Sequence, residues 1–326
     1  FAVHDDESCS VHYGYDHRSA AHLVSAQKGS ENPMTSATYG AAPKTNDSVT
    51  VNRPSKGHAI FHAIMVFVVM IVLLGIPFWL LVVTAGKTQA EAVVPNMSLP
   101  SQWHLLENFK TVLVDGKMIA AFFGSIVVTV PSVFLALLFG SMASWILARR
   151  TTKLLAVVYA LGISGLILPP AVVTVMMLLK IIGLSGTAVG MVGVYVGIYM
   201  STVIFFVTGF IRTIPVSLEE AARVDGAKPI RIFFTIILPL LGPTLATATI
   251  LVTLYIWNDV FYSLFILSGK MDLLPLNLYN VASAGLYLNN WHLIFAYIIL
   301  MSLPLLIIFA LAQKKIISGI TGGAVK

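Results

Sequence analysis

The sequence predicts an all-α protein that crosses a membrane with six helices. Of its 326 residues, 57% are hydrophobic and only 10% are charged, whereas a soluble domain carries roughly 25% charged residues. The mean hydropathy is +0.88. In addition, several long apolar runs each reach about 20 residues, the length of a helix that crosses the hydrocarbon layer of a bilayer.

Six segments meet this length criterion. The predicted spans are residues 59–85, 118–148, 154–179, 187–211, 240–267 and 293–312. The first contains no charged residue. The third contains Pro169 and Pro170, which predict a kink because proline lacks a backbone donor. Between the spans, residues 86–117 form a loop long enough for a short surface helix, whereas 268–292 contains Pro275 and several asparagines, including Asn289, and is expected to be irregular.

The N-terminal segment, residues 1–58, differs from the rest of the chain. It is polar and rich in Ser, His, Gly and Asn, and we expect a disordered arm. It has no apolar core like that of a signal peptide. The chain starts with Phe1, and Met34 is a plausible natural start, which predicts that residues 1–33 are not native. The membrane domain is expected over residues 59–326.

The distribution of positive charge predicts the orientation. With the N-terminus in the cytoplasm, 12 basic residues fall in cytoplasmic segments and five in outer ones, as the positive-inside rule requires. The cytoplasmic set is Arg53, Lys56, Arg149, Arg150, Lys153, Arg212, Arg223, Lys228, Arg231, Lys314, Lys315 and Lys326, and the outer set is Lys87, Lys110, Lys117, Lys180 and Lys270. Both termini are therefore predicted to be cytoplasmic.

Several kinds of chemistry are excluded. The pI near 9.3 comes from short basic clusters between apolar runs, a pattern of membrane topology rather than of nucleic-acid binding. Cys9 is the one cysteine, which excludes an internal disulfide and a cysteine metal cluster. The phosphate-binding pattern GxxxxGK[ST] is absent from the sequence. We expect no bound cofactor, no metal site and no catalytic residue.

The most informative segment is residues 212–241, between the fourth and fifth spans. Pro215 and Ser217 indicate a helix start, with Ser217 three residues before Glu220 in capping-box spacing. This helix is expected over 218–224, a second from Pro229, and Pro239 marks the start of the fifth span. On the first helix, the expected contact face is Leu218, Ala221, Ala222 and Val224, within a charged surface of Glu219, Glu220, Arg223 and Asp225. The residues alone leave open a docking loop and an ordinary solvated hairpin.

This segment resembles the EAA loop of ABC importer permeases. That pattern is Glu-Ala-Ala, three residues, Gly, nine residues, Ile, one residue and Leu-Pro. It matches Glu220, Ala221, Ala222, Gly226, Ile236, Leu238 and Pro239. The sequences at 225–227 (DGA), 256–259 (IWND), 302–304 (SLP) and the C-terminus are similar to the second permease of maltose-type and glycerol-phosphate-type importers, where Trp-Asn-Glu-Phe is usual and this chain has Trp257, Asn258, Asp259 and, after Val260, Phe261.

The resemblance implies the ABC type I importer permease fold over about residues 60–326, and a permease subunit for a sugar-like solute in a bacterial or archaeal plasma membrane. It also implies that Glu219, Glu220, Ala221, Ala222, Asp225, Gly226 and Pro239 couple the chain to an ATPase. The implied partners are a second permease, two ATPase subunits that use ATP and Mg²⁺, an extracellular or periplasmic solute-binding protein and membrane lipid.

Polar and aromatic residues in and after the fifth span are candidates for lining the solute pathway. They are Tyr255, Trp257, Asn258, Asp259, Asn277 and Asn280. Asp259 is an acid in or near a span, where charge is costly and function is the first hypothesis. Each candidate also has an alternative. Asp259 could instead lie at the outer membrane interface, and the amide and aromatic side chains could instead join helices.

Two other function classes are weighed. An ion-coupled secondary transporter should show inverted repeats and several ionisable residues within the membrane, and this chain has at most Asp259. A membrane-bound enzyme needs a convergent cluster of catalytic groups, and the sequence contains no such pattern.

Overall fold

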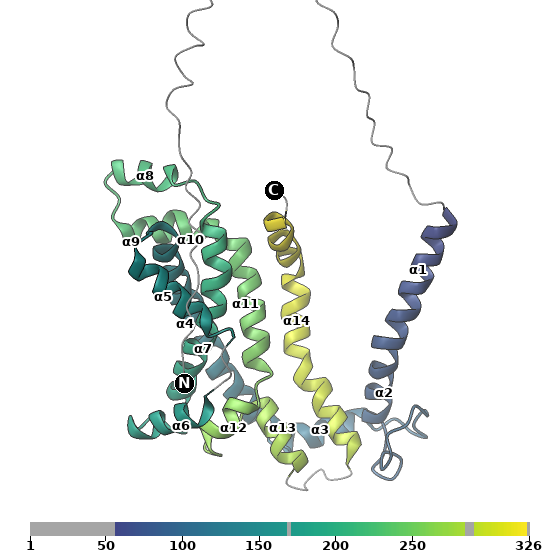
Figure 1. The fold of residues 1–326 in the computed structure, drawn as a ribbon. Coiled ribbons are helices and arrows are strands. Elements are labelled where there is room, and N and C mark those ends of the chain that lie inside the picture. The colour runs from purple at the N-terminus through teal and green to yellow at the C-terminus, as the bar shows by residue number, and fades with distance from the viewer. Residues whose placement is uncertain (1–55, 168–170, 284–289, 325–326) are drawn as a thin grey trace, which may run out of the picture. The chain divides into compact units, whose positions relative to one another are not determined.

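The apolar runs form long helices in the computed structural model, which describes residues 56–167, 171–283 and 290–324 (Figure 1). The chain divides after Gly57 into an N-terminal segment and a helical unit, His58–Lys326. The described residues form helices and no strand, which confirms the all-α prediction. The predicted disordered arm lies outside the described residues as far as residue 55, and helix begins at Lys56.

Four helical segments in the described residues are long and apolar enough to cross a membrane. They are Ile60–Ala85, Met118–Arg149, Ala188–Ile211 and Trp291–Leu311, and they correspond to the first, second, fourth and sixth predicted spans. The first consists of α1 (Lys56–Met70), a π-helical turn η1 (Ile71–Gly75) and α2 (Ile76–Ala85). The others are α4 (Met118–Arg149), α7 (Ala188–Ile211) and the first part of α14 (Trp291–Ala324).

The first span exposes an apolar surface over most of its length. Every residue from Ile60 to Trp79 is exposed, and nearly all are apolar. A soluble monomer rarely presents so large an apolar surface to water. This surface therefore fits a helix surrounded by lipid or by another membrane helix.

The third predicted span is not one helix. Residues 154–179 are divided between α5 (Lys153–Ser164) and α6 (Val172–Ile181). Twelve and ten residues give roughly 18 and 15 Å at 1.5 Å per residue, too short to cross a bilayer alone. The residue before a proline disfavours helical geometry, which agrees with an interruption ahead of Pro169 and Pro170. Those two prolines, and the kink expected there, lie outside the described residues.

The fifth predicted span is also divided. Helix α11 (Gly242–Trp257) ends at a break, and α12 (Phe261–Leu267) follows. On its other side, α11 is preceded by α9 (Pro229–Ile232), η2 (Phe233–Ile237) and α10 (Leu238–Leu240). The Pro229–Leu240 segment is bent by 78° from α11, so α11 begins at a corner of the chain.

Both long segments between predicted spans contain a helix, although only the first was expected to. The surface helix predicted in 86–117 is present as α3 (Leu105–Val114). The segment 268–292 contains α13 (Leu274–Ser283), so the expected irregular backbone is wrong there. Pro275 lies at the second position of α13, where a missing N–H costs little. The predicted helix breaker Asn289 lies outside the described residues.

The helices of this unit pack around two apolar clusters. One contains residues of α4, α7, α11, α12 and the 212–241 loop, including Tyr195, Val203 and Phe233. The other joins α2, α3, α4, α11, α13 and α14, including Trp257 and Tyr297. The most extensive contact between two helices of the described residues is that of α4 with α7. At Gly140 in α4, an added Cβ would lie 2.7 Å from Val203 Cγ1, so the glycine permits this close approach.

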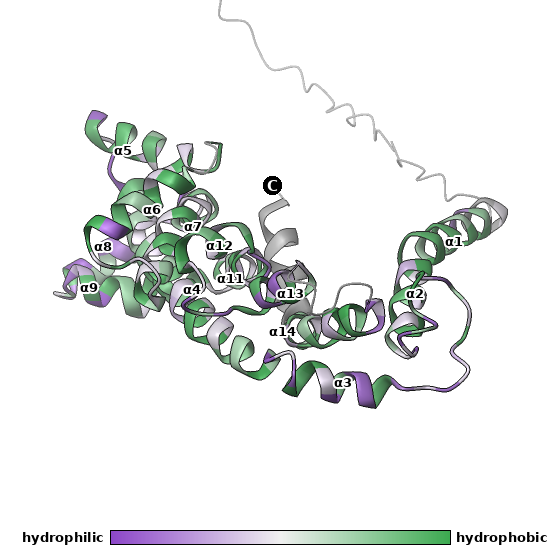
Figure 2. Cartoon of the chain, turned by 90° about the horizontal axis from the view of Figure 1, so that it is seen from below, coloured by the Kyte–Doolittle hydropathy of each residue, from purple (hydrophilic) through white to green (hydrophobic). Residues whose placement is uncertain are grey.

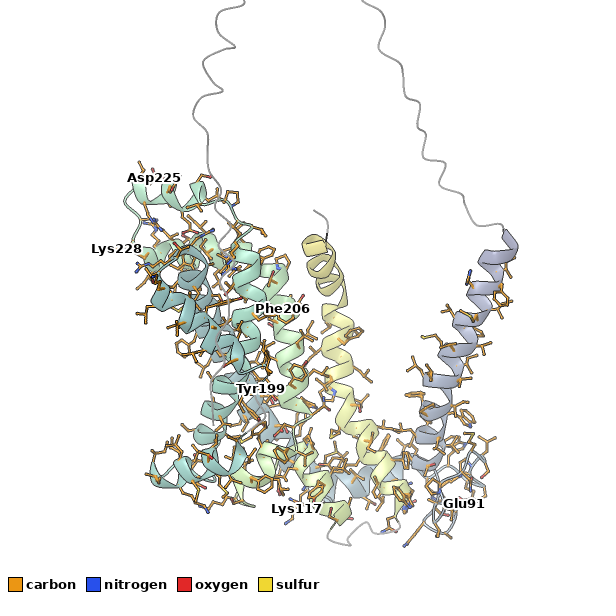
Figure 3. All side chains as sticks on the ribbon, viewed as in Figure 1. Glu91, Lys117, Tyr199, Phe206, Asp225 and Lys228 are labelled. Carbon is orange, nitrogen blue, oxygen red and sulfur yellow. The ribbon has the colours of Figure 1, made fainter. Side chains whose placement is uncertain are left out.

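Polar residues are concentrated at helix ends and connections. Figure 2 shows hydrophilic residues on α3, α8 (Ser217–Val224) and α9, whereas α1 is mostly hydrophobic. In Figure 3, Asp225 and Lys228 lie at one end of the α4–α7 helices and Lys117 lies at the other. These two ends are the cytoplasmic and outer sides in the orientation predicted from charge.

The connection between α2 and α3 is fixed by side-chain hydrogen bonds. Asn108 Nδ2 donates to the carbonyl oxygens of Ala85 (2.8 Å) and Lys87 (3.0 Å). The buried Lys87 Nζ donates to Asn96 Oδ1 at 2.6 Å. Glu91 accepts from the backbone N–H groups of Ser101 (3.1 Å) and Thr88 (3.2 Å). These bonds close the segment 87–101 into an ordered loop.

Acid is expected to open this loop. Hydrogen bonds from the Ser101 side chain and backbone, followed by those from Thr88, lower the pKa of Glu91 from 4.5 to about 2. The stabilisation is therefore complete above pH 4.5 and is lost as the pH falls through about 2. Hydrogen exchange at Ser101, corrected for intrinsic rates, should accelerate over this window in the native chain. Glu91→Gln should exchange at one pH-independent corrected rate, and an unchanged acid response in Glu91→Gln would contradict the assignment.

Candidate functional site: the 212–241 loop and the α11–α12 junction

Helix α8 is attached to the rest of the protein through a buried ion pair. The Glu219 side chain is 0% exposed, and its Oε1 accepts from Arg149 Nε at 2.7 Å. Arg149 Nη2 also donates to the Ile214 carbonyl oxygen at 2.9 Å, and Arg223 Nη2 reaches Glu219 Oε2 at 3.5 Å. Arg149 is the last residue of α4. Two charge-assisted hydrogen bonds from Arg149 thus join the loop to a membrane-spanning helix.

This finding corrects the expected position of Glu219. We expected it on the charged surface of α8, but it points into the protein and is paired there. The predicted capping box is also wrong. The N-cap is Val216, and no side chain caps the helix. The N–H groups of Glu219 and Glu220 instead donate to the Val216 carbonyl oxygen. Ser217 lies inside the first turn, one residue too late to cap it.

The other residues of α8 are divided between two faces. Leu218, Glu220, Ala221, Val224 and Asp225 are exposed, and Val224 is 88% exposed. Ala222 is half-buried and packs against the first apolar cluster, so it does not belong to the exposed contact face where we expected it. With Glu219 and Ala222 directed inward, α8 still leaves the side chains of Leu218 and Val224 exposed and available for contact.

Helix α8 ends in a glycine-based turn. Gly226 has φ +78°. The Gly226 N–H donates to the Arg223 carbonyl oxygen (3.0 Å), and the Ala227 N–H donates to that of Ala222 (2.9 Å), which is the Schellman pattern. This confirms the predicted helix end at Asp225–Gly226. Pro239 is the second residue of α10 and is exposed, just before the 78° bend into α11.

Gly226→Ala should loosen this turn through backbone conformation alone. No atom lies within 4 Å of an added Cβ at Gly226, so the cost is that of a left-handed residue, about 1–2 kcal/mol. Gly242→Ala is a matched control, because it also has open space but no positive φ. Hydrogen exchange of the Ala227 amide should increase in Gly226→Ala and stay unchanged in Gly242→Ala. Equal exchange in the two variants would show that the turn does not depend on Gly226.

The break between α11 and α12 is organised by Asp259. Asp259 Oδ1 accepts from the Tyr262 N–H (3.2 Å), and Oδ2 accepts from the Ser263 N–H (3.0 Å). Oδ2 also accepts from Tyr195 Oη of α7 at 2.8 Å. The carboxylate therefore caps the first turn of α12 and ties it to α7. With three donors, Asp259 has a clear local role in holding the junction.

The remaining candidate pathway residues do not form one cluster. Trp257 is buried and donates from Nε1 to the Met301 carbonyl oxygen at 3.3 Å. Asn277 is buried in α13, and its Oδ1 accepts from Tyr297 Oη at 2.7 Å. Asn258 is exposed and bonds to the Leu254 carbonyl oxygen. Asn280 is partly exposed on α13. Trp257 and Asn277 thus connect helices.

Tyr255 is the candidate that most clearly faces open space. It is 50% exposed, and its ring is stacked on Tyr199 of α7 with centroids 5.7 Å apart and an interplanar angle of 8°. Tyr199, labelled in Figure 3, is near the middle of α7. The two rings form a polar-edged aromatic surface between α7 and α11.

Several residues at these sites were not identified from the sequence. Arg149 was counted only as a topology charge, and Tyr195 and Tyr199 were not considered. A buried pair 70 residues apart leaves no local pattern. The tyrosines lie four residues apart in α7, on one helix face, and this spacing could have indicated a shared environment.

Comparisons with known proteins agree with the geometry. The family described as "Binding-protein-dependent transport system inner membrane component" matches residues 116–321. The chain is 35% identical over 262 residues to the melibiose/raffinose/stachyose import permease protein MelC of Bacillus subtilis (strain 168), covering 77% of this chain and 91% of MelC. It is 33% identical over 252 residues to AmyC of Thermoanaerobacterium thermosulfurigenes, a probable starch degradation products transport system permease protein, with the same coverage.

A solved structure shares the fold. It is the crystal structure of a bacterial ABC transporter involved in the import of the acidic polysaccharide alginate. One of its chains matches with a TM-score of 0.66 and 22% identity, covering 80% of this chain and 98% of that chain. Together with the long apolar helices, these matches favour neither a secondary transporter nor an enzyme. The chain is a multi-pass membrane protein that belongs to the inner-membrane component family of binding-protein-dependent transport systems, the permeases of ABC importers.

Proposed function

We propose that this chain is one of two permease subunits of an ATP-driven carbohydrate importer, and that the 212–241 loop receives the motion of an ATPase. The observation that carries the proposal is the attachment of α8: the helix exposes Leu218 and Val224, while Glu219 fixes it to Arg149 of α4. A docking helix needs both a free contact surface and a stiff connection to the spans.

The connection offers a direct route for movement. A displacement of α8 would act on Glu219, then on Arg149 at the end of α4, and then on α7, which packs along α4. On the other side, the bend at Pro239 leads into α11. Because packed helices move as rigid bodies rather than deforming continuously, pulling on α8 would shift α4 and α11 together. In this proposal Glu220, Ala221 and Asp225 belong to the ATPase contact.

The remaining components follow from this arrangement. The α8 end of the helices and both termini lie in the cytoplasm, as the positive-inside rule indicates. Two ATPase subunits bind ATP and Mg²⁺ there, and the chain itself binds no cofactor. A second permease completes the pathway, and an extracellular or periplasmic binding protein delivers the solute to the outer side of the plasma membrane.

The solute class is supported by relatives and by one surface. Two relatives bear names of oligosaccharide or starch-product import. The stacked pair Tyr199–Tyr255 offers the flat apolar face with polar edges that sugar rings pack against, and such convergent aromatic and polar groups are usual in small-molecule sites. We place Tyr255 and Asn258 on the solute pathway and regard Asp259, Trp257 and Asn277 chiefly as supports of its walls, with Asn280 near them.

The test is reconstitution of the complex with its binding protein and a panel of α-galactosides, maltodextrins and polyols. Native complexes should hydrolyse ATP faster with one solute class and import it. Val224→Glu should abolish ATPase association, because it places a charge at the 88% exposed apolar position. Val94→Glu, at a 70% exposed valine of the outer loop, is the matched control and should retain association. If Val224→Glu still binds ATPase and imports normally, α8 is not the docking helix.

A further inference from the structure

A basic cavity lies beside the predicted cytoplasmic ends of α4, α5 and α7, apart from the α8 surface. Its volume is about 570 Å³. Its lining includes Arg150, Lys153 and Arg212 and, among the lining residues, all of which the structure describes, no carboxylate. Three cations around one cavity repel one another, so the site favours an anionic occupant.

The cavity is built from helix ends. Arg150 directly follows α4, Lys153 opens α5, and Arg212 directly follows α7. Thr152 caps α5, its Oγ1 accepting from the Leu155 N–H at 3.4 Å. The 12-residue helix α5 thus directs the positive end of its dipole toward the cavity. The guanidinium of Arg212 lies 5.3 Å from the centre of the Tyr159 ring, a cation–π contact that holds it in place.

Part of the lining is apolar. Leu147, Ala148, Leu155 and Ala156 lie beside the cations and the hydroxyl-bearing Thr151, Thr152 and Tyr159. Beyond them, α5 exposes Leu154, Val157 and Leu161, the last at 68%. The cations of the cavity therefore lie where the apolar helices α4, α5 and α7 have one of their ends. An exposed apolar surface of α5 runs away from the cavity along the helix. A soluble phosphate compound would leave this apolar surface uncovered, whereas the acyl chains of a lipid would cover it.

We propose that this cavity binds the headgroup of an anionic phospholipid of the cytoplasmic leaflet. The phosphate lies among Arg150, Lys153 and Arg212, and the acyl chains lie along α5. Basic pockets between membrane helices on the cytoplasmic side suit anionic headgroups, and each Lys or Arg near an anionic surface contributes about 1 kcal/mol, which is roughly a fivefold change in affinity.

The test uses the assembled transporter, stripped of lipid in detergent and titrated with short-chain phosphatidylglycerol, phosphatidylcholine or inorganic phosphate. Native mass spectrometry counts the bound molecules. The native complex should bind phosphatidylglycerol at least tenfold more tightly than phosphatidylcholine. The triple variant Arg150→Gln/Lys153→Gln/Arg212→Gln removes all three cations. It should weaken phosphatidylglycerol binding about a hundredfold and leave phosphatidylcholine binding unchanged. Lys153→Gln alone should weaken it about fivefold.

The matched control removes three exposed lysines from the outer side. Lys110→Gln/Lys117→Gln/Lys180→Gln changes the net charge equally and should keep phosphatidylglycerol affinity. The proposal is overturned if the two triple variants behave alike, if the native complex binds both lipids equally, or if inorganic phosphate binds as tightly as phosphatidylglycerol. The last result would assign the cavity to a soluble phosphate compound. Failure to retain any lipid in the assembled complex would also overturn it.

Discussion

Arg149→Gln is expected to weaken the attachment of α8 by about 3–5 kcal/mol, because it leaves the carboxylate of Glu219 buried without its main partner. Glu219 is 0% exposed, and the remaining contact to Arg223 is longer, at 3.5 Å, with Arg223 more than half exposed. Hydrogen exchange of the α8 amides should therefore increase strongly, and solute-stimulated ATP hydrolysis should uncouple from import.

The double variant Arg149→Met/Glu219→Leu distinguishes a missing charge partner from a missing contact. Replacing a buried ion pair by apolar side chains is often neutral or stabilising. The double variant should therefore recover the protection of α8 that Arg149→Gln loses. Arg231→Gln, an exposed cation of α9, is the control and should leave α8 protection unchanged. If Arg149→Gln and Arg231→Gln show equal exchange, the buried pair does not hold the loop.

Recovery of protection and recovery of transport need not coincide. If the ion pair only fastens α8, the double variant should also import solute. If the pair has two arrangements during the transport cycle, a permanent apolar contact should hold α8 but slow import. Comparing exchange and transport in the same variant therefore measures how far the fastening itself takes part in coupling.

Local sequence patterns predicted the elements that depend on neighbouring residues. The apolar runs of 59–85, 118–148, 187–211 and 293–312 are long enough to specify helices without knowledge of their partners. The helix end at Gly226 was equally predictable, since it depends on one residue that tolerates positive φ. Hydropathy could not predict the divisions of 154–179 and 240–267, because it averages over a window of about 19 residues and cannot register breaks of seven and three residues.

The features that were missed depend on contacts between distant segments. Glu219 looks like a surface acid in its own helix, and only the position of Arg149, 70 residues earlier, places it inside. In the same way, Ser217 and Glu220 have capping-box spacing, but the chain starts the helix at a backbone turn of Val216. Asp259 was expected either on the solute pathway or at the outer interface. The hydrogen bond from Tyr195 gives it a third role, that of joining α12 to α7.

Asp259→Ala is expected to have the second largest effect on stability. It removes the acceptor of the Tyr262 and Ser263 N–H groups and leaves the hydroxyl of the fully buried Tyr195 without that acceptor. Loss of a helix cap costs about 1 kcal/mol, and an unsatisfied buried donor costs about 1–3 kcal/mol. The variant should therefore lose roughly 2–4 kcal/mol, seen as a lower Tm of the complex.

The partner variant separates the two contributions. Tyr195→Phe removes the hydroxyl but leaves the cap of α12 intact, so it should cost less than Asp259→Ala. In the double variant the costs should fall short of additivity by about 1.5–3 kcal/mol, the range for a hydrogen bond to a charged group. Tyr279→Phe, at an exposed tyrosine of α13, is the control and should leave Tm unchanged. Additive effects of Asp259→Ala and Tyr195→Phe would mean that α7 and α12 are not joined through this bond, and the wall beside Tyr199 and Tyr255 would then need another support.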